Sequence, residues 1–339
     1  MTLHRSRIVV ALSLAGALAL GACSSSDSGS EEEALVVYTG RDLELVEPLI
    51  EKFEETSGID VELRDGDSTE LAAQLLEEGA DSPAHVFLSQ DAGALGVLSD
   101  EGLLSELPED VTATVPDDYT SQDGSWVGLT GRARVITYDS EQIKAADVPR
   151  DVFELLDRKW KGQVAIAPTN ASFQAFVTAL RVTEGEDRAR EWLDGLIAND
   201  AQIYDKNSAI LEAVNAGTVQ LGLINHYYWA RYEGDPASQR AQIVFGEPGS
   251  VSALVNVTGA GILEPAAGNE DAQEFVEYLV SEDAQTYFLE ETAEYPLALD
   301  GATPAAVPPL SELGGPDIDL SDLASLETTV NLLTEVGLL

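Results

Sequence analysis

Two adjacent tyrosines, Tyr227 and Tyr228, have the most distinctive chemistry in this sequence. They follow an alternating apolar run at 218–224, which predicts a β-strand that ends near Asn225, and a helix is expected to begin at the tyrosines. In a continuing strand the two side chains would face opposite ways, whereas at a strand-to-helix corner both phenol oxygens can converge on one point.

Two converging phenolates suit a hard, highly charged cation such as ferric iron. Free tyrosine has a pKa of about 10, so a phenolate at neutral pH needs a strong Lewis acid beside it. Aromatic packing in a hydrophobic core is the alternative interpretation, and the tyrosine pair by itself leaves it open.

Alternating strands and helices are predicted as the elements that position this pair. Strands are expected at 34–38, 59–63, 84–88, 164–167 and 218–224, with longer extended segments at 127–138 and 251–263. Helices are expected at 44–56, 68–79, 92–102, 173–181 and 187–198, and Ser68 is expected to be the N-cap of the second helix. This order predicts an α/β fold with a mostly parallel sheet and helices on both faces.

The two long extended segments are expected to carry the chain from one lobe to a second lobe and back. Two crossings produce two discontinuous α/β lobes with a cleft between them, and such clefts bind ligands and close by hinge motion. The expected lobes are 34–133 with 259–309, and 134–258 with 310–339.

The N-terminus predicts export followed by attachment to a membrane through lipid alone. A short basic start precedes an apolar run at 8–20, which is too short to span a membrane comfortably but fits a signal peptide. The run ends in the lipobox-like sequence LGAC, so residues 1–22 are expected to be removed and Cys23 to be lipidated. Residues 23–33 are expected to form a flexible tether. An ordinary secretory signal is the alternative.

The composition is globular and strongly acidic. Sixty-one acidic residues face 18 basic residues, and the formal net charge is −43, so nucleic acid is a poor partner because phosphate contacts need a basic surface. An acidic surface can attract cations, but acid spread along the whole chain is more simply explained by solubility in a salty habitat. The single cysteine excludes a disulfide within the chain, so stability must come from the core.

Eight short motifs occur along the chain in a characteristic order and spacing. They are 37–41 (VYTGR), 81–87 (DSPAHVF), 129–134 (LTGRAR), 159–162 (KWKG), 167–173 (APTNASF), 205–208 (DKNS), 225–229 (NHYYW) and 294–297 (EYPL). Together they resemble the motifs of bacterial ferric-iron-binding proteins, the extracytoplasmic receptors of iron ABC transporters, and the resemblance covers nearly all of the mature chain. The resemblance implies a two-lobed periplasmic-binding-protein fold of type II, a monomer, and an ABC transporter permease as partner.

The resemblance also implies a set of ligands. Tyr227 and Tyr228 match the residues that supply two phenolates to Fe(III), and a carbonate or phosphate anion completes the coordination. The anion loop matches Asn170, Ala171 and Ser172, ahead of a helix whose free N–H groups favour an anion. Asn207 and Asn225 match two further anion contacts. From the residues alone, Asn170 and Asn207 are equally consistent with capping or turn formation.

The first-lobe half of the expected iron site departs from the family pattern. Asp42 stands where many members carry a histidine ligand, and Gln90 where many carry a glutamate. Asp42 can still offer a hard oxygen, whereas the neutral amide of Gln90 cannot balance charge. Asp91 follows and is either a substitute ligand or a surface acid. Arg41 and Arg132 are expected to hold carbonate bidentately, or else to pair with acids.

Enzymatic activity is not expected. The chain has three histidines and lacks the zinc-protease and serine-hydrolase motifs. Two alternatives to iron transport stay open. One is a receptor of the same fold for an oxyanion, a polyamine or a phosphorylated sugar. The other is a surface sensor or adhesin that has lost metal binding, which the missing histidine and glutamate ligands leave open.

Overall fold

A single mixed sheet runs through residues 34–339, the part of the chain that this computed structural model describes. The expected signal peptide, the tether and Cys23 lie outside the described residues. The strands are β1 (Leu35–Thr39), β2 (Val61–Asp65), β3 (Val86–Ser89), β4 (Val127–Asp139), β5 (Val164–Ile166), β6 (Gln202–Ile203), β7 (Leu221–Asn225), β8 (Ala241–Phe245), β9 (Val255–Ile262) and β10 (Tyr295–Pro296). Their order is β2-β1-β3-β9-β4-β7-β5-β6, and β8 and β10 also pair with β4.

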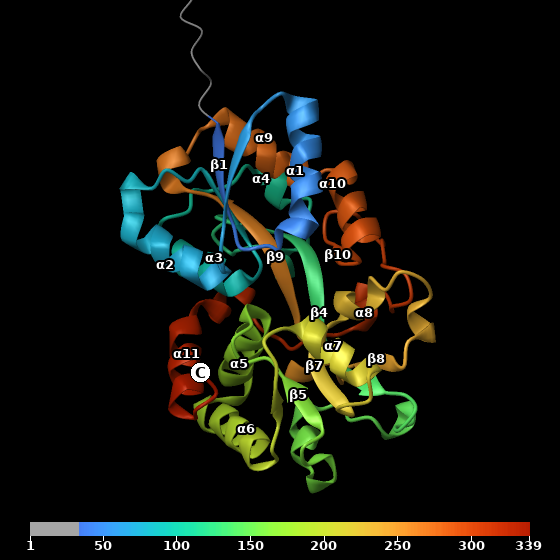
Figure 1. Cartoon of the computed structure of the whole chain (residues 1–339). Coiled ribbons are helices and arrows are strands. Elements are labelled where there is room, and N and C mark those ends of the chain that lie inside the picture. Colours follow the sequence, from blue (N-terminus) through green and yellow to red (C-terminus); the bar gives the residue numbers. More distant parts are fainter. Residues whose placement is uncertain (1–33) are drawn as a thin grey trace, which may run out of the picture. The chain divides into compact units, whose positions relative to one another are not determined.

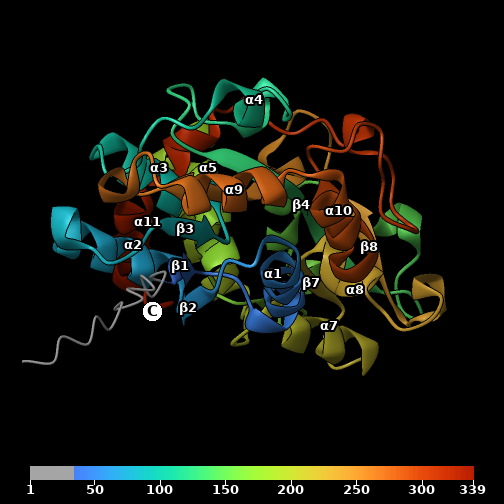
Figure 2. The same ribbon diagram turned by 90° about the horizontal axis from the view of Figure 1, so that it is seen from above.

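The helices flank this sheet on both sides. They are α1 (Leu43–Ser57), α2 (Ser68–Glu78), α3 (Ala92–Asp100), α4 (Glu109–Thr112), α5 (Ala171–Glu184), α6 (Glu186–Ala198), α7 (Asn207–Asn215), α8 (His226–Ala230), α9 (Glu270–Leu279), α10 (Glu282–Tyr287) and α11 (Leu326–Glu335). In Figures 1 and 2, α2 and α3 lie on one side of β1, and α1 and α10 lie on the other. The predicted helices and strands are therefore confirmed, with their ends displaced by a few residues.

The prediction of a mostly parallel sheet is wrong. Parallel pairing is confined to two groups of strands, β2-β1-β3 and β7-β5-β6. Between them, β9 and β4 pair antiparallel with each other and with their other neighbours. Helical crossovers enforce parallel pairing only between the strands they connect, whereas β4 and β9 run between the groups in opposite directions.

The long strand β4 is shared by the two groups. Its first half, up to Ala133, pairs with β9, and from Arg134 onward it pairs with β7 and β8. The change of partner occurs within one continuous strand, so the two groups of strands are linked by extended backbone and not by a loose linker. Arg134 therefore lies at the point where the two groups meet.

Helix α1 shows how local sequence determines these elements. Asp42 is the N-cap, and its carboxylate accepts the Glu44 N–H at 3.2 Å. Leu45, Leu49 and Phe53 are buried on one face, and the helix ends at Ser57 with Gly58 as C-cap, whose φ of 79° is in the left-handed region. In α2, the prediction that Ser68 is the N-cap is wrong by one residue. Asp67 caps the helix, and the Ser68 hydroxyl accepts the Gln90 N–H at 2.9 Å.

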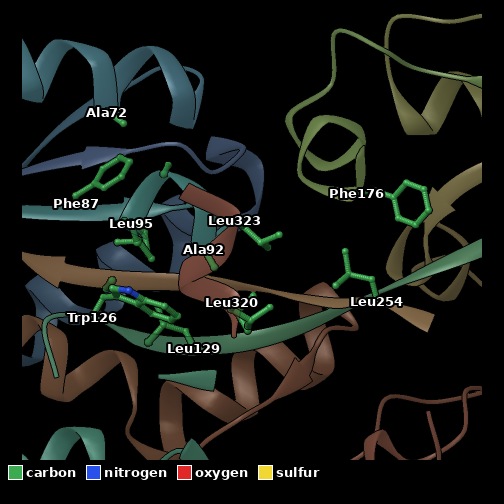
Figure 3. Packing of buried hydrophobic residues seen from close by; sticks show 14 of the residues in the cluster. Ala72, Phe87, Ala92, Leu95, Trp126, Leu129, Phe176, Leu254, Leu320 and Leu323 are labelled. Carbon is green, nitrogen blue, oxygen red and sulfur yellow. The ribbon is translucent and has the colours of Figure 1, made fainter. Parts of the chain in front are cut away.

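The C-terminal segment packs into the main hydrophobic core next to α3. Figure 3 shows Leu320 and Leu323 among Ala92, Leu95 and Leu129. This packing depends on Gly93 in α3, because a Cβ atom there would lie 2.6 Å from the carbonyl oxygen of Leu323. This close approach of the C-terminal segment to α3 is therefore possible because position 93 has no side chain.

We expect Gly93→Ala to lower the free energy of unfolding by about 1–3 kcal/mol, because backbone atoms must move to admit the methyl group. The effect opposes the gain in helix propensity of up to about 1 kcal/mol that Gly→Ala normally brings. Gly195→Ala in α6 is a matched control, since its Cβ would meet only the end of the Leu156 side chain, at 2.8 Å from Cδ1. Urea unfolding measures both, and equal stabilities of the two variants would contradict the prediction.

Within residues 34–339, no helix has both the length and the apolar character needed to cross a membrane.

Candidate metal centre

The tyrosine pair lies at the expected strand-to-helix corner. Strand β7 ends at Asn225 and helix α8 begins at His226, so Tyr227 and Tyr228 are in the first turn of a short helix. Their rings stack with centroids 4.4 Å apart and planes 27° apart. Tyr227 is buried and Tyr228 is half-buried. The two phenol side chains therefore lie side by side, as convergence on one ligand requires.

Both tyrosines line one cavity of about 500 Å³. Most of its other lining residues follow the carboxyl ends of strands from both groups. Gly40, Arg41, Asp42 and Leu43 follow β1, Asp65, Gly66 and Asp67 lie at the end of β2, Gln90 follows β3, and Asn170 follows β5. The remaining lining residues are Leu45 in α1, Lys206 directly before α7, and Arg231 directly after α8. The carboxyl ends of strands in α/β sheets are favoured ligand sites, and here both groups of strands contribute to one cavity.

Burial sets the protonation state of Tyr227. Burial raises the pKa of the Tyr227 phenol above its ordinary value of 10, and the neighbouring Tyr228 raises it further. The charges of Arg41 and Arg132 lower this pKa but do not cancel the rise. The Tyr227 phenol is therefore protonated at neutral pH unless a cation displaces its proton.

Three buried arginines lie close to the tyrosines. Arg41 donates from Nη2 to Oε1 of the buried Glu294 at 2.8 Å, while its Nε and Nη1 have no partner within residues 34–339. Arg132 donates to the Val257 carbonyl oxygen at 3.3 Å, and its Nε and Nη1 also lack partners in this part of the chain. Buried guanidinium groups with unused donors are typical of a site that binds an anion.

Arg134 belongs to this group, and sequence reasoning missed it. Its Nη1 donates to Ser172 Oγ and to Asn225 Oδ1, both at 3.4 Å. Burial lowers the pKa of Arg134 to about 9, so the side chain stays charged at neutral pH. The signal was present in the motif GRAR, because residues two apart on a strand point to the same face. Arg132 and Arg134 are two apart in β4, so their side chains lie on the same face of the strand.

The predicted anion residues of the second group of strands come together at the start of α5. Asn170 caps the helix by accepting the Ser172 N–H at 3.2 Å, and Ala171 is the buried first helical residue. Asn207 donates from Nδ2 to Asn170 Oδ1 at 3.2 Å and to Ser172 Oγ at 3.1 Å. Asn225 joins the network through Arg134. The structure thus places all five predicted residues beside one charged donor and one helix N-terminus.

The predicted residues of the first group are less well placed for a metal. Asp42 and Gln90 line the cavity, but the Asp42 carboxylate already caps α1. Asp91 is not a surface acid: it is 1% exposed and caps α3 by accepting the Ala94 N–H at 3.2 Å. Asp65 and Asp67 also line the cavity, and sequence reasoning missed them, although their position at the end of a predicted strand was a usable signal.

No group of three or more His, Cys, Asp or Glu side chains within residues 34–339 is arranged to hold a metal ion. His226, next to the tyrosines, is already committed. Its Nδ1 accepts the Ala133 N–H at 3.1 Å, which leaves Nε2–H to donate to the Ala293 carbonyl oxygen at 3.0 Å. Burial lowers the pKa of His226 to about 4, so the ring is neutral. A metal in this cavity would therefore depend on the phenol oxygens.

Two groups of strands, joined by extended crossing strands and contributing to one cavity, define a two-lobed solute-binding protein. The chain belongs to the family of bacterial extracellular solute-binding proteins, whose family model matches residues 81–314. It is 31% identical over 326 residues to the Fe(3+)-binding periplasmic protein of Serratia marcescens, an alignment that covers 95% of this chain and 94% of the relative.

Two solved structures agree with this assignment. Iron-bound HitA from Pseudomonas aeruginosa shares 32% sequence identity and superposes with a TM-score of 0.84, covering 90% of this chain and 99% of HitA. IdiA (FutA) of Trichodesmium, in complex with iron and citrate, shares 28% identity with a TM-score of 0.73, covering 90% and 99%. The resemblance inferred from the motifs and the two-lobed fold class are confirmed, and these relatives are binding proteins.

Proposed function

We propose that this protein is an extracytoplasmic receptor that binds ferric iron between its two lobes and delivers it, as a monomer, to the permease of an ABC transporter. The observation that carries the proposal is that Tyr227 and Tyr228 stack, with ring centroids 4.4 Å apart, and that both line one cavity. Phenolates are hard, anionic ligands, and ferric iron is the hard cation that displaces their protons at neutral pH. The Fe(3+)-binding protein of Serratia marcescens and iron-bound HitA support this choice.

An anion completes the proposed site. Two phenolates leave one positive charge on Fe(III), and the cavity adjoins buried arginines with unused donors. Carbonate or phosphate would accept from the α5 N-terminus at Ala171 and Ser172, and from Asn170, Asn207, Asn225 and Arg134. Arg41 and Arg132 would face the same anion from the first lobe. Citrate, present with iron in the Trichodesmium protein, is the alternative anion.

The first-lobe contribution is proposed to be weak. Asp42 would offer one carboxylate oxygen while it continues to cap α1, and Gln90 would act at most through its amide oxygen. The iron site is therefore built mainly on the second lobe, and the first lobe closes over it.

A visible spectrum of the purified mature protein tests the proposal. Adding ferric citrate, or ferric nitrilotriacetate with bicarbonate, is expected to produce an orange to red phenolate-to-iron charge-transfer band that survives desalting. The same additions to denatured protein control for adventitious iron. A colourless protein that retains no iron after desalting would reject the iron-receptor function.

The expected division into lobes supports a prediction about motion. The proposed lobes are 34–133 with 259–309 and 134–258 with 310–339, and the change of partner in β4 at Arg134 coincides with the first boundary. Ligands contributed by both lobes favour the closed state, so iron with its anion is expected to reduce the radius of gyration. Small-angle X-ray scattering measures this change, and identical curves with and without saturating iron would indicate binding on one lobe only.

The location of the mature protein is a further prediction. Lipidation of Cys23 is proposed to anchor the protein outside the cytoplasmic membrane, and a single acyl chain holds proteins only marginally, so several chains are expected. Cys23→Ser should move the protein from the membrane fraction to the soluble fraction or leave it unprocessed. Unchanged fractionation of this variant would exclude the lipid anchor.

A further inference from the structure

The buried ion pair between Arg41 and Glu294 joins parts of the chain that are 253 residues apart. Both side chains are fully buried, and Oε1 of Glu294 accepts from Arg41 Nη2 at 2.8 Å. The second carboxylate oxygen accepts the Thr130 hydroxyl at 2.8 Å. Both oxygens of Glu294 are thus occupied within the protein, while Arg41 lines the cavity and keeps Nε and Nη1 unpartnered within residues 34–339. Glu294 itself is not among the residues that line the cavity.

The segment around Glu294 also contacts the helix that carries the tyrosines. The Ala293 carbonyl oxygen accepts from His226 Nε2 at 3.0 Å, and the rings of Tyr295 and His226 lie 4.7 Å apart. Tyr295 and Pro296 pair with Gly131 and Thr130 of β4. Strand pairing on one side and contact with α8 on the other therefore restrain the segment that carries Glu294. Its carboxylate can then hold the Arg41 guanidinium in one position.

We infer that Glu294 is a positioning residue: it holds Arg41 beside the cavity, offsets its charge, and so limits how tightly the site holds the anion that accompanies iron. This inference rests on the proposed function. A buried charge with a counter-charge at hydrogen-bond distance attracts a third charge less than the same charge alone. Burial lowers the pKa of Arg41, but Glu294 and the two tyrosines raise it above its ordinary value, so Arg41 stays cationic.

Glu294→Gln separates the two effects. The amide keeps the shape and still offers an oxygen to Arg41 Nη2, but it removes the negative charge, so Arg41 is left oriented and uncompensated. We expect the bicarbonate or phosphate concentration that produces half of the charge-transfer colour to fall about tenfold. Thr130→Val is the matched control, because it removes the other hydrogen bond of Glu294 and leaves its charge. This variant is expected to shift the midpoint less than about twofold.

A double-mutant cycle tests whether Glu294 acts through Arg41. In an Arg41→Gln background, Glu294→Gln is expected to change the anion midpoint less than about twofold. An unchanged or raised midpoint in the single Glu294→Gln variant, or the same tenfold fall in the Arg41→Gln background, would overturn the inference. Phosphate binding to the iron-free protein, measured by calorimetry, gives a second readout that does not depend on colour. A colourless parent protein rejects the proposed function, whereas a coloured parent with an unresponsive Glu294→Gln variant rejects only this inference.

Discussion

Tyr227→Phe and Tyr228→Phe are each expected to abolish most of the visible colour and to weaken ferric-iron binding about a thousandfold. Each variant removes one anionic ligand, and losing a charged ligand costs several kcal/mol, which corresponds to about that change in affinity. The fold should survive, because the two rings still stack and only a hydroxyl is lost. Competition against a ferric chelator measures the affinity, and the absorption spectrum reports the remaining phenolate.

Tyr295→Phe is the matched control. Tyr295 is also buried and lies beside His226, but its hydroxyl donates to the Pro308 carbonyl oxygen at 2.8 Å and it does not line the cavity. This variant should keep both colour and affinity. Asp42→Ala and Gln90→Ala should each weaken iron binding less than Tyr227→Phe or Tyr228→Phe does. If the Tyr227 and Tyr228 variants bind iron like the parent, the pair is ordinary core packing and the iron-receptor proposal fails.

The local elements of the fold were predictable from the sequence because they depend on local patterns. The α1 stripe of Leu45, Leu49 and Phe53 defines one buried face, and the apolar run before Asn225 becomes a strand whose five residues are all buried. The strand-to-helix corner at the tyrosines follows from the same patterns. It requires only that one periodicity stop and another begin.

The direction of β9 was not predictable in this way. Strand pairing is a long-range property, and nothing within 255–262 shows that this strand runs antiparallel between β3 and β4. The cap of α2 was missed for a smaller reason: Asp67 and Ser68 are both good caps, and the Ser68 hydroxyl is committed to Gln90. That hydrogen bond joins residues 22 apart and becomes visible only in the folded chain.

In the candidate site too, local sequence patterns predict some features, while others depend on contacts between distant parts of the chain. Asn170, Ser172, Asn207 and Asn225 could be named only through a family resemblance, because each residue alone is an ordinary cap or turn former. The sequence prediction omits Arg134, although this residue stands two positions from Arg132. The sequence predicts Asp91 to be a ligand or a surface acid, but it is the buried N-cap of α3. Its burial depends on packing against other elements, which local sequence does not show.

The affinity for ferric iron is expected to rise steeply with pH. Burial, and then Tyr228, raise the pKa of the Tyr227 phenol above 10, so iron must displace its proton throughout the physiological range. Binding prefers the deprotonated form, and each proton released raises the affinity about tenfold per pH unit. Two tyrosine ligands therefore predict a rise of about a hundredfold per unit between about pH 5 and 7. His226 adds no step in this range, since burial lowers its pKa to about 4.

Comparing variants removes the contribution of the competing chelator, which also releases protons. With the same chelator, the slope of log affinity against pH should be lower by about one in Tyr228→Phe than in the parent, because Tyr228→Phe releases one proton fewer on binding iron. The slope of Tyr295→Phe should equal that of the parent. Tyr227→Phe should show the same loss of slope. Parallel lines for the parent and both cavity variants would mean that no phenol proton is displaced. Iron would then be held by other oxygens, even if the tyrosines affected its affinity through packing.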